Sequence, residues 1–366
     1  MLFKNKGGWA VFFLSVGLSL VGLVFIYSAS SYTAQLRYGD AFFFVKKQAV
    51  ALGVGVLAFF GGRFIRPEWL KKGKWIILAF SAAFLALVYV PGLGMSSYGA
   101  TRWISFGFVT VQPSEVSKFG LMIFLAAYLS DHPPVCVKNC IVPALAVLGV
   151  CALVITEPNM SITMVIAFSS ILLFFVAGLP RKTFLPLGVC ALVGAVGLIV
   201  LEPYRIKRLT AFLDPWQTPK AEGYQLIQSF YAVASGGLFG KGLFNSRQKL
   251  LFLPFSESDF IFSVIAEETG LFGCSLLMFL FAILIVCGFK TAIDAKNRYE
   301  MLLSAGLTGI IGFQTLINLA VVTGCIPPTG VPLPFVSAGG SSLISFLFFS
   351  GVLSGLSART KVGPVA

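Results

Sequence analysis

The sequence predicts an all-α polytopic membrane protein with about ten transmembrane helices. Of its 366 residues, 57% are hydrophobic and only 11% are charged, whereas soluble domains carry about 25% charged residues. The apolar residues also fall in long blocks, and about 20 consecutive apolar residues cross the roughly 30 Å hydrocarbon core of a bilayer. The predicted spans are 8–30, 45–64, 74–91, 114–130, 140–156, 160–178, 183–201, 260–289, 300–323 and 338–358.

The chain reads as a single transmembrane domain over 1–366, because no low-complexity tract or clear internal repeat divides it. One long polar interruption, about 202–259, separates the seventh and eighth spans. We expect the chemistry of the protein in this loop.

The distribution of positive charge predicts the orientation. With the N-terminus inside, the inner segments hold 15 of the 27 Lys and Arg, whereas the short outer loops hold four. The positive-inside rule therefore places both termini in the cytoplasm and the long loop outside. The net charge of +13 is spread over the inner loops, which indicates contact with anionic membrane lipids and not nucleic-acid binding.

Within the long loop, residues 220–236 show helical spacing. Tyr224 and Tyr231 fall on one side, and Gln225 and Ser229 fall on another. This pattern predicts an amphipathic helix that lies at the outer membrane interface.

Two charges stand at the start of the span 114–130. Glu115 and Lys118 are three residues apart and are therefore neighbours on a helix surface. Charge inside a bilayer costs at least about 2.5 kcal/mol on insertion scales, so such residues call for a reason. They form either a structural ion pair that fixes the helix or a site at which Lys118 meets an anion in a polar cavity.

Asp259 directly precedes the span 260–289. One interpretation is a helix N-cap, a common role for Asp. The other starts from the length of this span, about 45 Å, which exceeds the hydrocarbon thickness. Its first turns then stand in the outer interface, where Asp259 meets water and substrate. Glu267 and Glu268 follow in the same helix as candidate supporting groups.

Two further features border the long loop. Arg205 and Arg208 follow the seventh span at the outer headgroup level, where they either bind a lipid-linked phosphate or anchor the helix by snorkelling. The segment 324–342 is too rich in Pro and Gly for a regular helix. Since irregular backbone at membrane depth needs protein or a wet cavity around it, this segment either lines a cavity or is an ordinary outer turn.

Six short motifs run along the chain. They are Gly99-Ala-Thr-Arg-Trp-Ile104, Gln112-Pro-Ser-Glu-Val-Ser-Lys118, Tyr204-Arg-Ile-Lys-Arg208, Gly223-Tyr-Gln-Leu-Ile-Gln-Ser229, Asp259-Phe-Ile-Phe262 and Pro332-Leu-Pro-Phe-Val-Ser-Ala-Gly-Gly-Ser-Ser342. In this order they resemble the SEDS family (shape, elongation, division and sporulation), which includes FtsW, RodA and SpoVE. Tyr27-Ser-Ala-Ser30 and the stretch 39–47 look more like the FtsW and SpoVE branch.

The resemblance implies a peptidoglycan glycosyltransferase that polymerises lipid II into a growing glycan strand. It places the active site on the outer face of the bacterial cytoplasmic membrane. It also implies a partner, a class B penicillin-binding protein that crosslinks the glycan as a transpeptidase, and no organic cofactor. The essential Asp of the family falls on Asp259. Whether the chain serves division, elongation or sporulation stays open.

The expected reaction assigns a role to each charged residue. Asp259 takes the proton of the acceptor hydroxyl as general base in an inverting transfer. The pyrophosphate leaving group is neutralised by a divalent cation (Mg or Mn), Arg102, Lys118, Arg205 or Arg208. Glu115, Glu267 and Glu268 are expected to support the site. Further substrate contacts are expected from Gln225, Ser229, Ser337, Gly339, Gly340 and Ser341.

The chain departs from the family pattern at two places. Similar proteins show Pro-Glu-x-x-Thr-Asp before Phe-Ile-Phe, whereas this chain has Pro254-Phe-Ser-Glu-Ser-Asp259. A metal-binding role of that Glu would therefore move to Glu257. The usual Pro-Asp after the fifth span is Pro158-Asn159 here.

Two other functions use the same features. A lipid II flippase predicts charged groups along a path through the membrane, and few inward cavity charges are evident beyond Glu268. A non-enzymatic scaffold for the penicillin-binding protein predicts that the charge of Asp259 is dispensable.

Overall fold

A computed structural model describes residues 6–97, 100–105, 110–157, 159–180, 182, 186 and 203–359. The predicted span 183–201, apart from residue 186, and the motif residues Gly99 and Pro158 lie outside these ranges.

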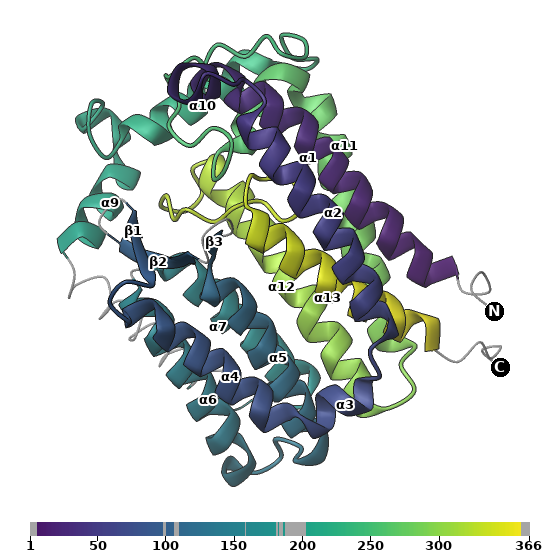
Figure 1. Ribbon diagram of the computed structural model, residues 1–366. Helices are drawn as coiled ribbons and strands as arrows, with labels where there is room; N and C mark the ends of the chain where they lie inside the picture. Colours follow the sequence, from purple (N-terminus) through teal and green to yellow (C-terminus); the bar gives the residue numbers. More distant parts are fainter. Residues whose placement is uncertain are drawn as a thin grey trace.

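The described chain is mainly helical, and most helices run side by side through one bundle (Figure 1). A short 3-10 turn follows α4 at Leu87–Tyr89, and another follows α9 at Pro215–Gln217. The helices are α1 (Lys6–Tyr38), α2 (Phe43–Phe64), α3 (Pro67–Lys72), α4 (Lys74–Ala86), α5 (Pro113–Asp131), α6 (Val137–Thr156), α7 (Met160–Val176), α9 (Pro203–Leu213), α10 (Tyr224–Gly236), α11 (Ile261–Ile293), α12 (Arg298–Val322) and α13 (Gly340–Arg359).

The polytopic membrane fold predicted from hydropathy is confirmed. Every predicted span other than 183–201 coincides with a helix, and within the described residues six helices are long and apolar enough to cross a membrane. These six are α1, α2, α6, α11, α12 and α13. The number of ten spans stays a prediction. The helix predicted over 220–236 is α10, which begins at Tyr224.

The centre of the bundle is formed by α5, α12 and α13. Nearly every residue of α5 is buried. In the apolar stretches of α12 and α13, 72% and 83% of the residues are buried, against 22% in α6. Small residues allow this packing, because α2 and α13 meet at Gly62 and Gly351. A Cβ atom at Gly351 would lie 2.0 Å from the carbonyl oxygen of Phe59, so only glycine lets the two backbones touch.

A small antiparallel sheet interrupts the helical pattern and was not predicted from the sequence. Its strands are β1 (Gly94–Ser97), β2 (Ala100–Ser105) and β3 (Thr110–Val111), in the order β1-β2-β3. Ile104 of β2 is fully buried and pairs with Gly94. The sheet, α9 and α10 lie at one end of the bundle, and both chain termini lie at the other (Figure 1).

The predicted helix 260–289 is α11, but its backbone breaks at Gly270 (φ 65°, ψ −164°). The carbonyls of Glu267 and Glu268 accept from the amides of Lys241 and Gly242 at 2.9 and 3.0 Å. The amide of Leu271 donates to the carbonyl of residue 237 at 2.9 Å. The segment after α10 thus replaces the helical hydrogen bonds that the break removes, as membrane proteins require.

Candidate functional site

A side chain of α12 holds the backbone of Asp259. Asn318 of α12 donates its side-chain amide to the carbonyl of Asp259 at 2.8 Å and to that of Val331 at 2.7 Å. The N-cap of α11 is Phe260, with no side-chain cap. The N-cap interpretation of Asp259 is therefore wrong, because its carboxylate does not bond the first turn of the helix. Asp259 is partly exposed.

The segment 324–342 packs against the loop that carries Asp259. Gly330 has a positive φ of 74°, and a Cβ atom there would lie 3.2 Å from Oδ2 of Asp259. The Ser337 hydroxyl donates to the carbonyl of Ser258 at 2.6 Å. Arg208 of α9 donates from Nη1 to the carbonyl of residue 328 at 3.0 Å. This segment therefore forms one wall of the site and is more than an outer turn.

Three charged residues act on the Asp259 carboxylate. Burial raises the pKa of Asp259 to about 6, against the lowering effect of Arg102 on β2 and Arg208 on α9. Glu257 adds to the rise by repulsion. Burial likewise raises the pKa of Glu257. Sheet and loop thus bring two arginines and two carboxyls together from segments far apart in the sequence.

Glu157 is a member of this charged group that sequence reasoning missed. It follows α6, is only 1% exposed, and its backbone carbonyl accepts from Nε of Arg102 at 3.0 Å. Burial raises the pKa of Glu157 to about 8, against the lowering effect of Arg102 and Ser114. The signal in the sequence is the carboxylate of Glu157, directly before the Pro158-Asn159 pair.

A groove of about 280 Å³ opens beside Arg208. Gln225 of α10, Pro254, Phe255 and Pro328 line it. The Gln225 side chain donates to the carbonyl of Pro254 at 3.1 Å. The predicted Gln225 and Arg208 thus meet at one accessible surface, next to the wall that borders Asp259.

Lys118 does not reach this surface in the structure. It is fully buried, and its Nζ lies 2.9 Å from Oε2 of Glu115 and 2.6 Å from Oε1 of Gln314. The Ser342 hydroxyl donates to the same Glu115 oxygen at 2.7 Å. The geometry favours the structural ion pair, which ties α5 to α12 and α13. Substrate binding by Lys118 stays a prediction.

The remaining predicted contacts fall into two groups. Ser229 donates to a carbonyl of α12 at 2.8 Å, and Ser341 accepts from the backbone of residue 112 at 3.4 Å; both are buried. Gly339 donates to a side chain of α2 at 3.1 Å, and Gly340 begins α13. These residues, with Ser337, hold the walls of the site together. Arg205 lies in α9, and its side chain is outside the described part of the chain.

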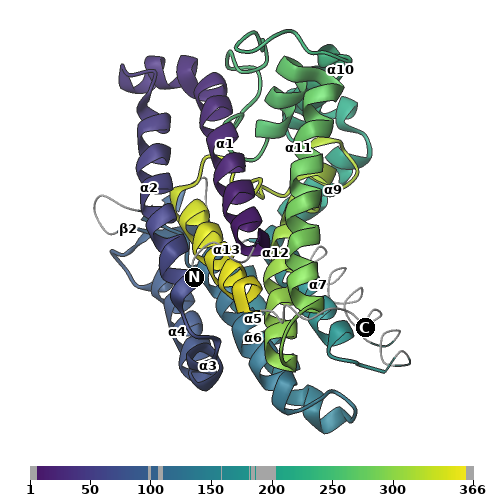
Figure 2. The ribbon, with the colours of Figure 1, turned by 90° about the vertical axis from the view of Figure 1, so that its right-hand side faces the viewer.

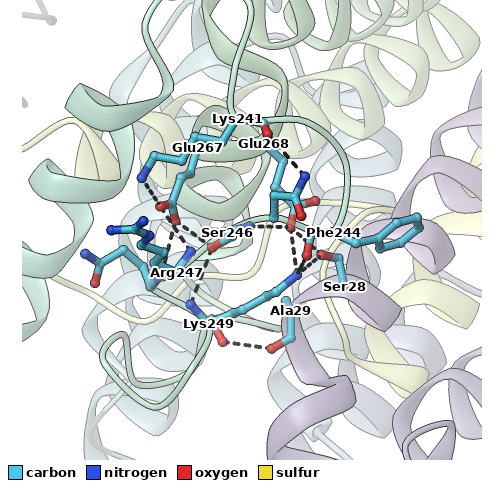
Figure 3. Close-up of polar contacts among 12 residues, drawn as sticks. Ser28, Ala29, Lys241, Phe244, Ser246, Arg247, Lys249, Glu267 and Glu268 are labelled. Carbon is cyan, nitrogen blue, oxygen red and sulfur yellow. Dashed lines mark hydrogen bonds and ion pairs between the residues drawn. The ribbon is translucent and has the colours of Figure 1, made fainter.

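Glu267 and Glu268 anchor the outer loop to the bundle, as Figure 3 shows. Glu267 pairs with Lys241 at 2.7 Å and also accepts from Ser246 and two backbone amides. Glu268 pairs with Lys249 at 3.0 Å and accepts from Ser28 of α1. The two carboxylates therefore fix the first turns of α11, which directly follow Asp259; a supporting role in the reaction stays a prediction.

The donor set for a divalent cation is small. In the described part of the chain, no three of the side chains of His, Cys, Asp and Glu come together in a metal-binding group. Glu257 and Asp259 are two carboxyls, and Arg102 and Arg208 already supply positive charge beside them. These residues alone do not build a cation site, and the expected Mg or Mn stays a prediction.

The fold and the site define a polytopic membrane protein with a carboxylate–arginine site at the end of the bundle opposite its termini. A family model described as cell cycle protein, of FtsW, RodA and SpoVE, matches residues 9–362. The chain therefore belongs to the FtsW/RodA/SpoVE family, as its motifs predicted.

Several relatives are similar over nearly the full length. Stage V sporulation protein E of Bacillus subtilis is 40% identical over 94% of this chain and 95% of its own. A probable peptidoglycan glycosyltransferase FtsW of Geobacter sp. (strain M18) is 36% identical over 96% of each chain. These relatives support the FtsW and SpoVE branch.

Solved structures share the fold. A chain from work described as structural coordination of polymerization and crosslinking by a peptidoglycan synthase complex has a TM-score of 0.80 and 31% identity, covering 97% of this chain and 98% of that one. The rod shape determining protein RodA of Thermus thermophilus has a TM-score of 0.72 and 28% identity, covering 98% of each chain.

Proposed function

We propose that this protein is a peptidoglycan glycosyltransferase that polymerises lipid II into glycan strands. Relatives that share about a third of its residues are named for this activity. The observation that carries the proposal is the Asp259 carboxyl, partly exposed and flanked by the charges of Arg102 and Arg208. The carboxyl suits a sugar hydroxyl, which must lose its proton, and the arginines suit a pyrophosphate, whose negative charge must be neutralised.

Asp259 acts as the general base. The acceptor hydroxyl is a weak nucleophile, and a carboxylate within hydrogen-bond reach takes its proton as the new C–O bond forms. A pKa of about 6 leaves Asp259 mostly ionised at neutral pH. The pKa of the base then lies closer to the pH at which the enzyme operates, which favours proton transfer. One direct displacement at the anomeric carbon inverts the α-linked donor to a β-linked product.

The arginines stabilise the leaving group. A pyrophosphate departs without a proton when its charge is neutralised, which explains why one carboxylate suffices where glycosidases use two. Arg208 borders both the groove and the wall of Asp259, and its planar guanidinium suits a phosphate. Gln225, which lines the same groove, contacts the polar head group.

The membrane sets the surroundings of this reaction. We place both termini in the cytoplasm and the site on the outer face, following the distribution of basic residues. We also propose a class B penicillin-binding protein as partner. The support is the structural similarity to a chain from a peptidoglycan synthase complex that coordinates polymerization and crosslinking.

A polymerisation assay in liposomes tests this function. We expect the protein with its partner to convert lipid II into long glycan on a gel. Asp259→Asn should yield none, while Asp40→Asn, a control at an exposed ion pair of the same end, should retain activity. Translocation of labelled lipid II without polymer would instead indicate a flippase. Polymerisation by Asp259→Asn equal to that of the wild type would contradict the assignment of the base.

A further inference from the structure

A second groove lies at the end of the bundle that holds the termini. Its volume is about 420 Å³, within the range of small-molecule sites. It is lined by α3, by Ser130 near the end of α5, and by the start of α12. Arg359 in the last turn of α13 lies 4.0 Å from Glu68 of α3, so this groove is far from Asp259 along the bundle axis. Figure 2 shows α3 toward the end of the bundle opposite α10.

Two cations that line this groove have no carboxylate partner among the described residues. Lys72 of α3 is exposed and makes no ion pair there. Arg298, the first residue of α12, donates to a backbone carbonyl at 2.6 Å but pairs with no acid. In contrast, neighbouring Lys71 already pairs with Asp131 at 2.6 Å. The groove thus offers positive charge that the protein itself does not neutralise.

The start of α12 favours an anion in the groove. Arg298, its first residue, lines the groove, and the N-terminal end of a helix carries a partial positive charge. Tyr299 also lines the groove and is only 4% exposed. Its hydroxyl oxygen is buried, makes no hydrogen bond within the described part of the chain, and lies near the carboxylates of Glu68 and Glu300, so it is not a phosphate contact.

The groove also contains acids, and the ligand must match them. Glu68 is exposed and Glu300 is buried, and both line the same groove as Lys72 and Arg298. A ligand with only negative charge would be repelled by the two carboxylates. A ligand that carries one anion and one hydrogen-bonding cation satisfies both kinds of residue.

The surrounding aromatic residues place the groove at the membrane surface. Trp69 of α3 is 66% exposed and Trp75 of α4 is 53% exposed. Exposed Trp residues of membrane proteins gather at the headgroup level of the bilayer. The molecules that carry a phosphate at this level are phospholipids.

We propose that this groove binds the headgroup of an amine-bearing zwitterionic phospholipid, from the leaflet at the end of the chain termini. The phosphate lies toward Lys72 and Arg298. The primary ammonium lies toward Glu68 and Glu300. Phosphatidylglycerol lacks the ammonium, and the quaternary amine of phosphatidylcholine cannot donate a hydrogen bond, so both bind more weakly.

Native mass spectrometry of the full chain in detergent tests the proposal. Phosphatidylethanolamine, phosphatidylglycerol and phosphatidylcholine are offered separately at equal concentration. The double variant Lys72→Gln/Arg298→Gln should lose affinity for phosphatidylethanolamine by about tenfold or more. Lys290→Gln removes an exposed charge of the last turn of α11 outside the groove, and it should bind like the wild type.

The outcomes separate the sources of the phosphate. Preference for phosphatidylethanolamine that the double variant loses, at an unchanged melting temperature, supports the proposal. Equal retention of all three lipids, or equal binding by wild type and double variant, overturns it. Displacement by millimolar inorganic phosphate as effective as displacement by soluble glycerophosphoethanolamine also overturns it, because a free anion would then be the ligand.

Discussion

The proposed base predicts how activity depends on pH. Asp259 must be ionised to accept a proton, and its pKa is about 6. Below this pH it is protonated and inactive, and above it is ionised, so kcat/KM rises with pH. From the titration equation, the ionised fraction is about one tenth at pH 5 and about nine tenths at pH 7. Activity should therefore rise about tenfold over this range, whereas an ordinary Asp would change it by less than about 10%.

The acid limb of the profile is the pH range over which activity rises. Two substitutions should move it in opposite directions. Glu257→Gln removes a negative neighbour that raises the pKa of Asp259, so the limb moves to lower pH. Arg208→Gln removes a positive neighbour that lowers it, so the limb moves to higher pH. Each displacement is expected to be about one pH unit, as for a close charge at a partly exposed site.

The assay is polymerisation of lipid II at subsaturating concentration from pH 5 to 8, with each profile normalised to its own plateau. Lys207→Gln, an exposed neighbour of Arg208 in α9, is the matched control and should leave the limb in place. A wild-type profile that is flat between pH 5 and 7 would refute the reasoning. So would a shift of both variants in the same direction, since that would point to another titrating group.

Three further predictions concern the supporting structure. Lys118→Ala leaves Glu115 buried and unpaired, so it should lower the free energy of unfolding by about 3–5 kcal/mol, measured by thermal unfolding in detergent. Gly270→Ala meets both a positive φ and an atom at 2.4 Å, and should cost more than about 1 kcal/mol, whereas Gly53→Ala, with open space around it, should not. Glu157 has a pKa of about 8 and is neutral at pH 7, so Glu157→Gln should keep wild-type polymerisation at pH 7; a loss of more than tenfold there would show that its charged form is needed.

Much of the helical framework could be predicted from hydropathy alone. Long apolar blocks predict spans because the bilayer requires them, and the charges of loops predict their side. The break at Gly270 could not be read from the sequence, since a lone glycine in an apolar block is compatible with an unbroken helix. The segment after α10 supplies the hydrogen bonds that the break removes, and this stabilises the broken helix.

The residues of the site that belong to sequence motifs could be predicted. The contacts between residues far apart in the sequence could not. Asp259 and Arg208 carry family motifs, and the structure places both in one site. Arg102 also stands in a family motif and was predicted as a site residue, but the sheet that carries it was not predicted, because its strands are too short and too irregular. For Lys118 the sequence allows either an ion pair with Glu115 or an anion site, whereas its contact with Gln314, almost two hundred residues further on, is evident only in the structure.

The most direct test of the central claim separates binding from chemistry at Asp259. Binding of lipid II and single-turnover formation of the first glycosidic bond are measured for the wild type and for Asp259→Asn, which keeps the shape of the side chain. The account predicts that the variant binds lipid II within about threefold of the wild type while bond formation falls by at least about 100-fold, the range for a lost general base. Bond formation at the wild-type rate by Asp259→Asn would contradict it.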